Sequence, residues 1–457
     1  MQFVKRSSLL IVGNMVKLMV QLLLLFWLSR KLSVEHYGQY QSLWLYINVL
    51  SVVALFGLPA LILSSGEHAI QQWVSTHQKK VIIGAILLLA LPLLYILLAA
   101  KSFSLLNRGL IGLLITTQIL NILTETRAIK QQKETRLMMV NIFYHLAFFA
   151  VHWIWVTATT LSFSFLLYWL IALSVLKTLL LHQPLPAELT PPTSNSSLGK
   201  QWFYLGMYDV AGVLFKWIDK WFILAFVSVS QFAAYYNGSY EIPVFSILLT
   251  AVSNILLVEM AKLSLTNKEQ IIQLFHRSAY FLAAFVFPAF CFLFSYHREV
   301  FLLIFSDKYA TAIPVFLVSL LVLPVRISNY TAALQVYHQS KIILIGALLD
   351  LALALLLMAC LYPVWGLPGL AAAFVISTYV QAAYYLWHTS ALIGKPIGQL
   401  LPWRHLLLLL VFCVVLMQAS VKWLVFSNPY LQLGAGLAVG GCMCIALLYF
   451  FTRRKWI

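Results

Sequence analysis

The chain has 457 residues, of which 62% are hydrophobic and only 9% carry a charge, against about 25% in an ordinary soluble domain. Its mean hydropathy of +0.91 is spread over the whole length, which excludes a soluble protein and a soluble domain with one membrane anchor. The net charge of +17 is typical of a polytopic membrane protein with basic residues near its membrane ends, and it requires no nucleic-acid partner.

About fourteen apolar segments are long enough to cross a membrane as helices, because some 20 apolar residues span the hydrocarbon core. Pro and Gly interrupt several of these segments, which neighbouring helices can accommodate. We expect spans at approximately 8–29, 39–63, 81–100, 109–126, 137–158, 162–182, 202–227, 232–257, 278–296, 310–337, 342–361, 367–392, 405–425 and 429–451.

Polar segments between the spans indicate how the chain is organised. The longest runs from His182 to Lys200 and is rich in Pro, Ser and Thr, as a linker would be. Glu67–Lys80 and Glu259–Arg277 mix charged with apolar residues, which predicts short helices at the membrane surface. Most of the 30 Lys and Arg, including Lys177, are assigned to one side, which places both chain ends in the cytoplasm.

Two pairs of windows indicate an internal repeat. Ser33–Ser51 matches Ser228–Ser246 without a gap, and Asn121–Lys133 matches Asn329–Lys341. Both copies would leave the cytoplasm in the same direction, which makes a parallel repeat about an axis along the membrane normal. We expect an all-α fold of two six-helix bundles and two additional C-terminal helices with a basic tail. The predicted divisions are 1–182, a cytoplasmic linker at 183–199, 200–392 and 393–457.

Four motifs in chain order resemble those of one known family. Arg30–Tyr40 contains Tyr-Gly-x-Tyr after the first span, and Asp219–Tyr235 contains an Asp-Lys pair and a second Tyr. Phe305–Pro314 is similar to a third motif of that family, Phe-Gly-x-x-Tyr-x-x-Ala-x-Pro, and Gly366–Ala373 is similar to a fourth, Gly-x-x-Gly-x-Ala. Together they resemble the polysaccharide exporters and lipid-linked oligosaccharide flippases of the multidrug/oligosaccharidyl-lipid/polysaccharide (MOP) superfamily. Three positions where Gly is usual differ here: Ser33, Ala233 and Ser306.

The resemblance implies a flippase of the bacterial inner membrane. Its substrate would be an undecaprenyl-pyrophosphate-linked oligosaccharide, carried across by alternating access for the synthesis of O-antigen, capsule or exopolysaccharide. A coupling ion, H⁺ or Na⁺, and the glycan polymerase and chain-length machinery would be its partners. The resemblance implies no enzymatic activity.

Charged residues at membrane depth are costly and are therefore the main candidates for function. The candidate cations for a pyrophosphate are Lys17, Lys216, Lys220 and Arg326. The candidate coupling-ion or ion-pair carboxylates are Asp209, Asp219, Glu241 and Asp350. The competing interpretation is that these residues pair with one another and lock helices together.

Other chemistry finds little support in the sequence. The five Cys lie in apolar segments without a C-x-x-C pair, and no metal or cofactor is expected. His145 and His152 lie seven residues apart on one helical face, which leaves a proton relay open, although a solitary pair of histidines is a weak signal. Glu125 and Arg127 are interpreted as residues at the end of a span.

Two alternative functions remain open. A multidrug antiporter of the same superfamily typically has 12 spans, fewer than are expected here. A membrane-embedded glycan polymerase or ligase commonly carries a large extracytoplasmic loop, whereas the loops of this chain are short. The sequence also lacks G-x-x-x-x-G-K-[ST], H-E-x-x-H and D-x-D, the motifs of common nucleotide-driven and metal-dependent enzymes.

Overall fold

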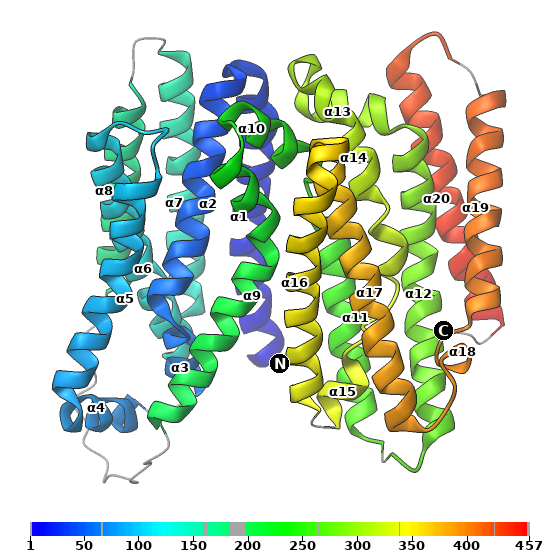
Figure 1. Ribbon diagram of the computed structural model, residues 1–457, viewed down its shortest axis with the longest axis horizontal. Coiled ribbons are helices and arrows are strands. Elements are labelled where there is room, and N and C mark those ends of the chain that lie inside the picture. Colours follow the sequence, from blue (N-terminus) through cyan, green and yellow to red (C-terminus); the bar gives the residue numbers. More distant parts are fainter. Residues whose placement is uncertain are drawn as a thin grey trace. The chain divides into compact units, whose positions relative to one another are not determined.

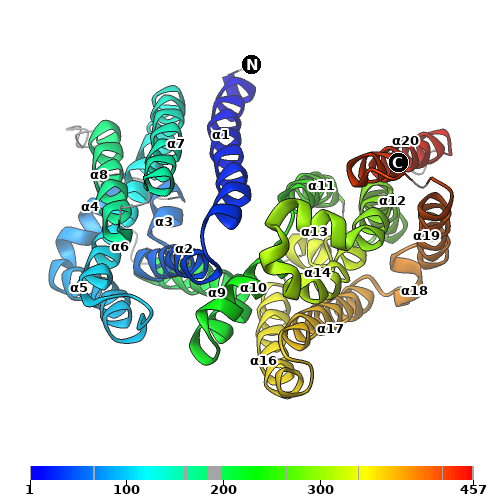
Figure 2. The ribbon, with the colours of Figure 1, turned by 90° about the horizontal axis from the view of Figure 1, so that it is seen from above.

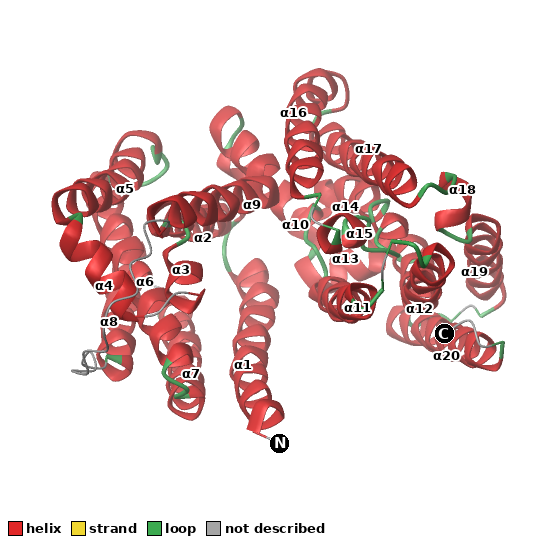
Figure 3. Cartoon of the chain, turned by 90° about the horizontal axis from the view of Figure 1, so that it is seen from below, coloured by secondary structure: helices red, strands yellow, loops and turns green. Residues whose placement is uncertain are grey.

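The computed structural model describes residues 2–64, 67–158, 162–182, 198–263, 265–337, 339–424 and 426–454. Throughout these ranges the regular elements are helices, joined by short loops (Figures 1 and 3). The all-α prediction is therefore confirmed. The chain forms two compact units, unit 1 at Met1–Ala233 and unit 2 at Ala234–Ile457.

Unit 1 contains the helices α1 to α9 and the start of α10. Their bounds are α1 Gln2–Lys31, α2 Val34–Leu55, α3 Leu58–Ser64, α4 Glu67–Thr76, α5 Gln78–Ala99, α6 Leu105–Lys130, α7 Glu134–Thr157, α8 Phe163–Leu181, α9 Leu198–Phe226 and α10 Val229–Gly238. Within this unit α1 packs along α7, α6 packs along α8, and α9 packs against α2 and α3.

Unit 2 continues from the second half of α10. Its elements are α11 Pro243–Ala261, α12 Lys268–Ser295, α13 His297–Phe305, η1 Asp307–Ala312, α14 Ile313–Leu320, η2 Leu323–Val325, α15 Ala332–Val336, α16 Ser340–Trp365, α17 Leu367–Ile393, α18 Ile397–Leu400, α19 Trp403–Trp423 and α20 Pro429–Arg453. The pair α16 and α17 packs closely, and α12 packs against both α19 and α20 (Figure 2).

The number of long helices agrees with the expected architecture. In the described part of the chain, ten helices are long and apolar enough to cross a membrane, or up to eleven if α10 and α11 together form one span. Helices α1, α2 and α9, with 30, 22 and 29 residues, coincide with three further predicted spans. The protein is thus a multi-pass membrane protein with about fourteen spans.

The two predicted surface helices have different outcomes. Glu67–Lys80 contains the short helix α4, as expected, followed by the start of α5. The prediction of a separate short helix at Glu259–Arg277 is wrong, because α11 ends at Ala261 and α12 begins at Lys268. Ile271 and Phe275 are buried in the first turns of α12, so these turns belong to the long helix.

The predicted linker falls largely outside the described residues, since 183–197 are not among them. The division of the chain at this linker and the parallel repeat therefore stay predictions. In the sequence, the boundary between the two compact units falls between residues 233 and 234, and α9 packs with the helices that precede it.

Each of the two windows Ser33–Ser51 and Ser228–Ser246 of the predicted repeat begins with a serine that caps a helix. Ser33 caps α2 by accepting a hydrogen bond from the backbone N–H of His36 at 3.2 Å. Ser228 precedes α10 and accepts one from the N–H of Gln231 at 3.3 Å. Such serine caps satisfy a backbone donor that the first helical turn leaves free. The sequence motif thus marks the start of a helix in both halves of the chain.

A sharp break between α2 and α3 positions the start of α9. Phe56 adopts φ 40° and ψ 57°, in the left-handed region, and Gly57 follows with φ 73°. This conformation costs a bulky residue roughly 1–2 kcal/mol. A Cβ on Gly57 would lie 2.4 Å from the backbone nitrogen of Gly206 in α9. The break and α9 therefore meet through two glycines that allow their backbones to approach closely.

Candidate functional site

Helix α1 presents one of the predicted cations. Its buried face carries Val20, Leu24 and Leu28, and Trp27 stacks on Trp153 of α7 with ring centroids 4.8 Å apart. Lys17 lies on the same stripe of the helix, two turns before Leu24, and its side chain is exposed there. It makes no hydrogen bond or ion pair with any residue that the structure describes.

Helix α9 holds four of the predicted residues in two different environments. Asp219 is only 4% exposed and accepts a hydrogen bond from Lys220 Nζ at 3.0 Å. Lys216 is exposed, whereas Asp209 is half-buried. The ammonium groups of Lys216 and Lys220 each lie 5.7 Å from the centroid of the Trp217 ring, a distance at which a cation is attracted to an aromatic face. The helix therefore carries one paired lysine and one exposed lysine.

The fourth predicted cation is paired within unit 2. Arg326 follows the short segment η2 and forms an ion pair with Glu241, which precedes α11. Both residues lie where the helical backbone is interrupted, and both side chains are partly exposed. The ion pair connects two interruptions that are distant in the sequence.

Asp350 lies on the closely packed face between α16 and α17. A Cβ on Gly346 would be 2.3 Å from Tyr385 Cε1, which explains the absence of a larger side chain there. Tyr385 donates a hydrogen bond to the carbonyl of Ile343 at 2.9 Å. Ser377 lies beside the Asp350 carboxylate, but Asp350 Oδ1 is buried without a hydrogen-bond partner among the described residues. Within the described part of the helix pair, this oxygen can therefore still accept a hydrogen bond or bind a cation.

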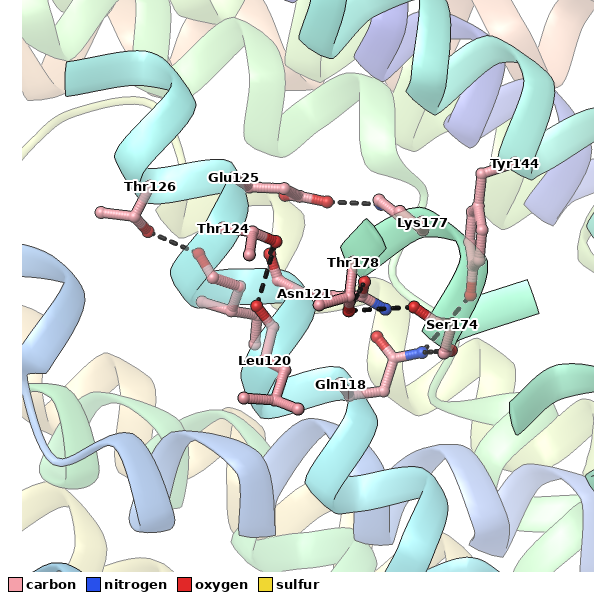
Figure 4. Close-up of polar contacts among 11 residues, drawn as sticks. Gln118, Leu120, Asn121, Thr124, Glu125, Thr126, Tyr144, Ser174, Lys177 and Thr178 are labelled. Atoms are coloured by element: carbon pink, nitrogen blue, oxygen red, sulfur yellow. Dashed lines mark hydrogen bonds and ion pairs between the residues drawn. The ribbon is translucent and has the colours of Figure 1, made fainter. Parts of the chain in front are cut away.

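A buried polar layer in unit 1 was not predicted from the sequence (Figure 4). Its centre is an ion pair between Glu125 of α6 and Lys177 of α8. Lys177 Nζ also lies 4.4 Å from the ring centroid of Tyr144 on α7. Interpreting Glu125 as a residue at the end of a span, and Lys177 as one of the basic residues on the cytoplasmic side, missed this contact. The ion pair joins two helices and is shielded by a third.

Hydrogen bonds extend the polar layer along α6 and α8. Gln118 Nε2 donates to Ser174 Oγ at 2.9 Å, and Thr178 Oγ1 donates to Asn121 Oδ1 at 2.9 Å (Figure 4). Gln118, Asn121 and Glu125 follow one another at the spacing of one helical face, a signal that could have revealed the layer. Interhelical hydrogen bonds of this kind stabilise membrane bundles.

The Tyr-Gly-x-Tyr motif packs against α7. Tyr40 Oη lies 3.0 Å from His152 Nε2, and His152 Nδ1 lies 2.7 Å from the carbonyl of Phe148. Because that carbonyl can only accept, Nδ1 carries a proton and Nε2 accepts from Tyr40. The Phe148 ring lies 4.2 Å from His152 and 6.5 Å from His145. His152 is therefore bonded to the motif tyrosine, and an aromatic ring lies beside both histidines.

Metal ligands do not cluster in the part of the chain that the structure describes. There, no group of three or more His, Cys, Asp or Glu side chains is placed to hold a metal ion. The chemistry that these residues offer is therefore electrostatic: exposed cations, ion pairs and one carboxylate oxygen without a partner.

The fold is similar to solved membrane transporters. "Lipid II flippase MurJ, inward closed conformation" matches with a TM-score of 0.72 and 13% identity, covering 99% of both chains. An inward-facing multidrug resistance MATE family transporter of the MOP superfamily matches with a TM-score of 0.53 and 12% identity, covering 84% of this chain and 98% of that one. A MATE structure in complex with MaL6 matches with a TM-score of 0.54 and 14% identity, covering 86% and 96%.

The sequence itself identifies the family. No curated protein sequence matches the chain. A family model described as "Polysaccharide biosynthesis protein" matches residues 27–314, which is more than half of the chain. The resemblance seen in the four motifs is thereby confirmed. The chain belongs to the polysaccharide biosynthesis protein family and has the fold of the MOP superfamily.

Proposed function

We propose that this protein is a flippase that moves an undecaprenyl-pyrophosphate-linked oligosaccharide from the inner to the outer leaflet of the bacterial cytoplasmic membrane. The glycan would serve O-antigen, capsule or exopolysaccharide synthesis. Membership of the polysaccharide biosynthesis family and the similarity to the fold of a lipid II flippase support this proposal. Alternating access provides the movement, and the protein itself catalyses no covalent step.

The observation that carries the proposal is the exposure of Lys17 and Lys216. Each lies well inside a long helix, α1 or α9, and neither forms an ion pair with a residue that the structure describes. A lysine facing hydrocarbon costs several kcal/mol, so such residues face water or an anion. A pyrophosphate is an anion that two lysines can neutralise during its passage.

Lys220 and Arg326 bind the substrate by exchanging their carboxylate partners for the pyrophosphate. Both are paired with carboxylates, Asp219 and Glu241. Substrate contact requires the pyrophosphate to compete with these carboxylates, and Arg offers a bidentate fork that suits phosphate oxygens. Pairing in the absence of substrate avoids an uncompensated charge in the membrane.

The coupling ion is H⁺ or Na⁺, bound by one of the intramembrane carboxylates. Asp350 has an oxygen without a partner in the described structure, and Asp209 is half-buried on α9. Asp219 and Glu241 are already paired. Asp350 is therefore the carboxylate best suited to take up a cation, followed by Asp209.

Reconstituted protein tests the proposal directly. Proteoliposomes containing a fluorescent lipid-linked oligosaccharide would be treated with a membrane-impermeant quencher to measure movement between leaflets. We expect translocation by the wild-type protein and at least a tenfold loss in Lys17→Gln and Lys216→Gln. Absence of translocation by well-folded wild-type protein, with or without a proton or sodium gradient, would contradict the proposal.

A multidrug antiporter is the second candidate, because MATE transporters share the fold. Those structures leave roughly 15% of this chain uncovered, whereas the MurJ structure covers 99%. Export of a cationic dye, unaffected by Lys17→Gln, would favour the antiporter. A polymerase or ligase is distinguished in cells: without a flippase the lipid-linked unit accumulates on the cytoplasmic face, and without a polymerase or ligase it accumulates outside.

A further inference from the structure

An aromatic pocket lies at one end of unit 1, between α4, the start of α5 and the start of α9. These elements lie together at the lower end of unit 1 in Figure 1. The pocket has a volume of about 250 Å³, slightly below the ~300–1,000 Å³ of sites for drug-sized ligands. That volume is of the size of one sugar ring with a phosphate.

Four aromatic side chains form the walls of the pocket. Trp73 and Trp202 meet edge to face with ring centroids 5.7 Å apart, and Phe56 meets Trp202 in the same way at 6.1 Å. Phe203 lies 6.1 Å from Phe56. Aromatic faces carry partial negative charge, so they attract the C–H faces of a pyranose ring. The walls are therefore suited to a sugar.

The walls are held in place from several directions. The left-handed Phe56 at the α2–α3 break packs on Gly206, where a Cβ would lie 2.3 Å from Phe56 Cδ1. Gly199 at the start of α9 leaves room for Trp73, whose Cζ2 would lie 3.3 Å from a Cβ at that position. Two glycines thus allow the rings of Phe56 and Trp73 to lie against α9.

Polar groups define the charge of the occupant. His77 and Lys80 line the pocket, and none of the lining residues that the structure describes is acidic. An aromatic box also attracts cations, but the lysine opposes a positively charged ligand. Trp202 Nε1 is buried and has no hydrogen-bond partner among the described residues. An indole N–H donates only, so it requires an acceptor oxygen, which a sugar hydroxyl or a phosphate supplies.

The surface beside the pocket suits a lipid chain. Val81 lines the pocket, and the apolar residues that follow on α5 are exposed in successive turns. The exposed positions include Ile82, Ile83, Ile86, Leu87 and Leu91. A headgroup in the pocket can therefore continue into a hydrocarbon chain along α5 without leaving an apolar surface.

We propose that this pocket binds the sugar-bearing pyrophosphate headgroup of a lipid-linked glycan, with its polyprenyl chain lying along α5. The inference rests on the proposed flippase function and assigns a docking site for the substrate outside the set of intramembrane cations. Trp73 and Trp202 contact the sugar, and Lys80 contacts the phosphate. The site selects substrates by their membrane-proximal sugar.

Equilibrium binding tests the site on the full-length protein in nanodiscs of phosphatidylethanolamine. The probe is farnesyl-pyrophosphoryl-N-acetylglucosamine, and farnesyl pyrophosphate without sugar is the comparator. We expect Trp73→Ala to weaken binding of the sugar-bearing probe about tenfold and binding of the comparator less than twofold. Lys80→Gln should weaken binding of both about threefold to tenfold, because it removes the phosphate contact.

Two further variants distinguish the loss of a ligand contact from misfolding of the protein. Trp202→Phe retains a ring but removes the N–H donor, and we expect about fivefold weaker binding of the sugar-bearing probe, as for one lost hydrogen bond. Lys79→Gln is the matched control, because Lys79 is exposed on the same turn but does not line the pocket. It should bind both probes like the wild type.

Several outcomes would overturn the proposal. Unchanged affinity in both Trp73→Ala and Trp202→Phe would remove the pocket as a sugar site. Equal weakening of both probes by Trp73→Ala, with displacement of the probe by phosphatidylglycerol, would indicate an ordinary phospholipid site. Translocation by the same wild-type preparation separates the two hypotheses: translocation with unaffected variants contradicts only the pocket, and variant-sensitive binding without translocation contradicts only the flippase.

Discussion

The exposed lysines of unit 1 lead to a prediction about transport at the level of single residues. Lys17→Gln should retain normal membrane abundance, since the side chain has no partner to lose among the described residues, and translocation should fall at least tenfold. Lys17→Arg should restore part of the rate, because the charge remains. Lys31→Gln is the control, an exposed lysine at the end of the same helix. Equal rates for Lys17→Gln and wild type would remove Lys17 from the path.

Arg326 allows its two roles to be separated. Arg326→Gln leaves Glu241 without this partner, so we expect the free energy of unfolding to fall by about 1–3 kcal/mol and membrane abundance to decrease. The fall is limited because both side chains are partly exposed. Arg326→Gln combined with Glu241→Gln should restore abundance. Continued loss of translocation in this double variant would assign Arg326 to the substrate, and recovered translocation would assign it to structure alone. Arg326→Lys should fall between wild type and Arg326→Gln.

Individual residues were less predictable from the sequence than helices. Charges inside apolar segments are conspicuous, which singles out Asp219, Lys220, Glu241 and Arg326, but their partners could not be assigned. Such assignment depends on which helices are neighbours. Lys177 was counted with the loops, although its pairing with Glu125 places it inside the bundle. A residue near the end of a span cannot be assigned to loop or interior by its position alone.

Two glycines offer a matched test at the level of helices. A Cβ at Gly38 on α2 would lie 2.5 Å from the backbone oxygen of Val229, whereas a Cβ at Gly109 on α6 would have no described atom within 4 Å. Gly38→Ala should destabilise the protein by more than ~2 kcal/mol, because a backbone atom would have to move. Gly109→Ala should be neutral or stabilise by up to ~1 kcal/mol. Thermal unfolding in detergent measures both, and a similar midpoint for the two variants would contradict the packing of α2 against α10.

The helices themselves were largely predictable, and their interruptions were not. Eleven of the fourteen expected spans each coincide with one long helix, because long apolar runs are a strong signal, whereas 39–63 and 232–257 are each divided into two helices. The expected span at 310–337 is instead divided into η1, α14, η2 and α15. Pro314 and Pro324 lie in this segment and mark such breaks, but whether neighbours support a continuous helix cannot be read from one segment. The same limitation explains the incorrect surface helix at Glu259–Arg277.

Across the whole molecule, the distribution of basic residues predicts an orientation. After replacement of the five native Cys by Ser, Lys79→Cys should react with an impermeant maleimide only in permeabilised inner membranes. Lys101→Cys, in the turn between α5 and α6, should react from the outside. This follows from the tendency of Lys and Arg to remain in the cytoplasm. The reverse labelling pattern would invert the predicted topology and place the aromatic pocket on the opposite side.

The polar layer between α6 and α8 has a consequence for biosynthesis. Asn121 bonds to Thr178, 57 residues later in the chain, so the partners of α6 do not yet exist when α6 reaches the insertion machinery. At about 5–20 residues per second, the ribosome needs roughly 3–11 s to supply them. During that interval Gln118, Asn121 and Glu125 must remain beside water, other protein or the translocon, because exposure to lipid is costly. Release of α6 into the bilayer should therefore wait for α8, and nascent chains that end before Ser174 should crosslink to the translocon through α6.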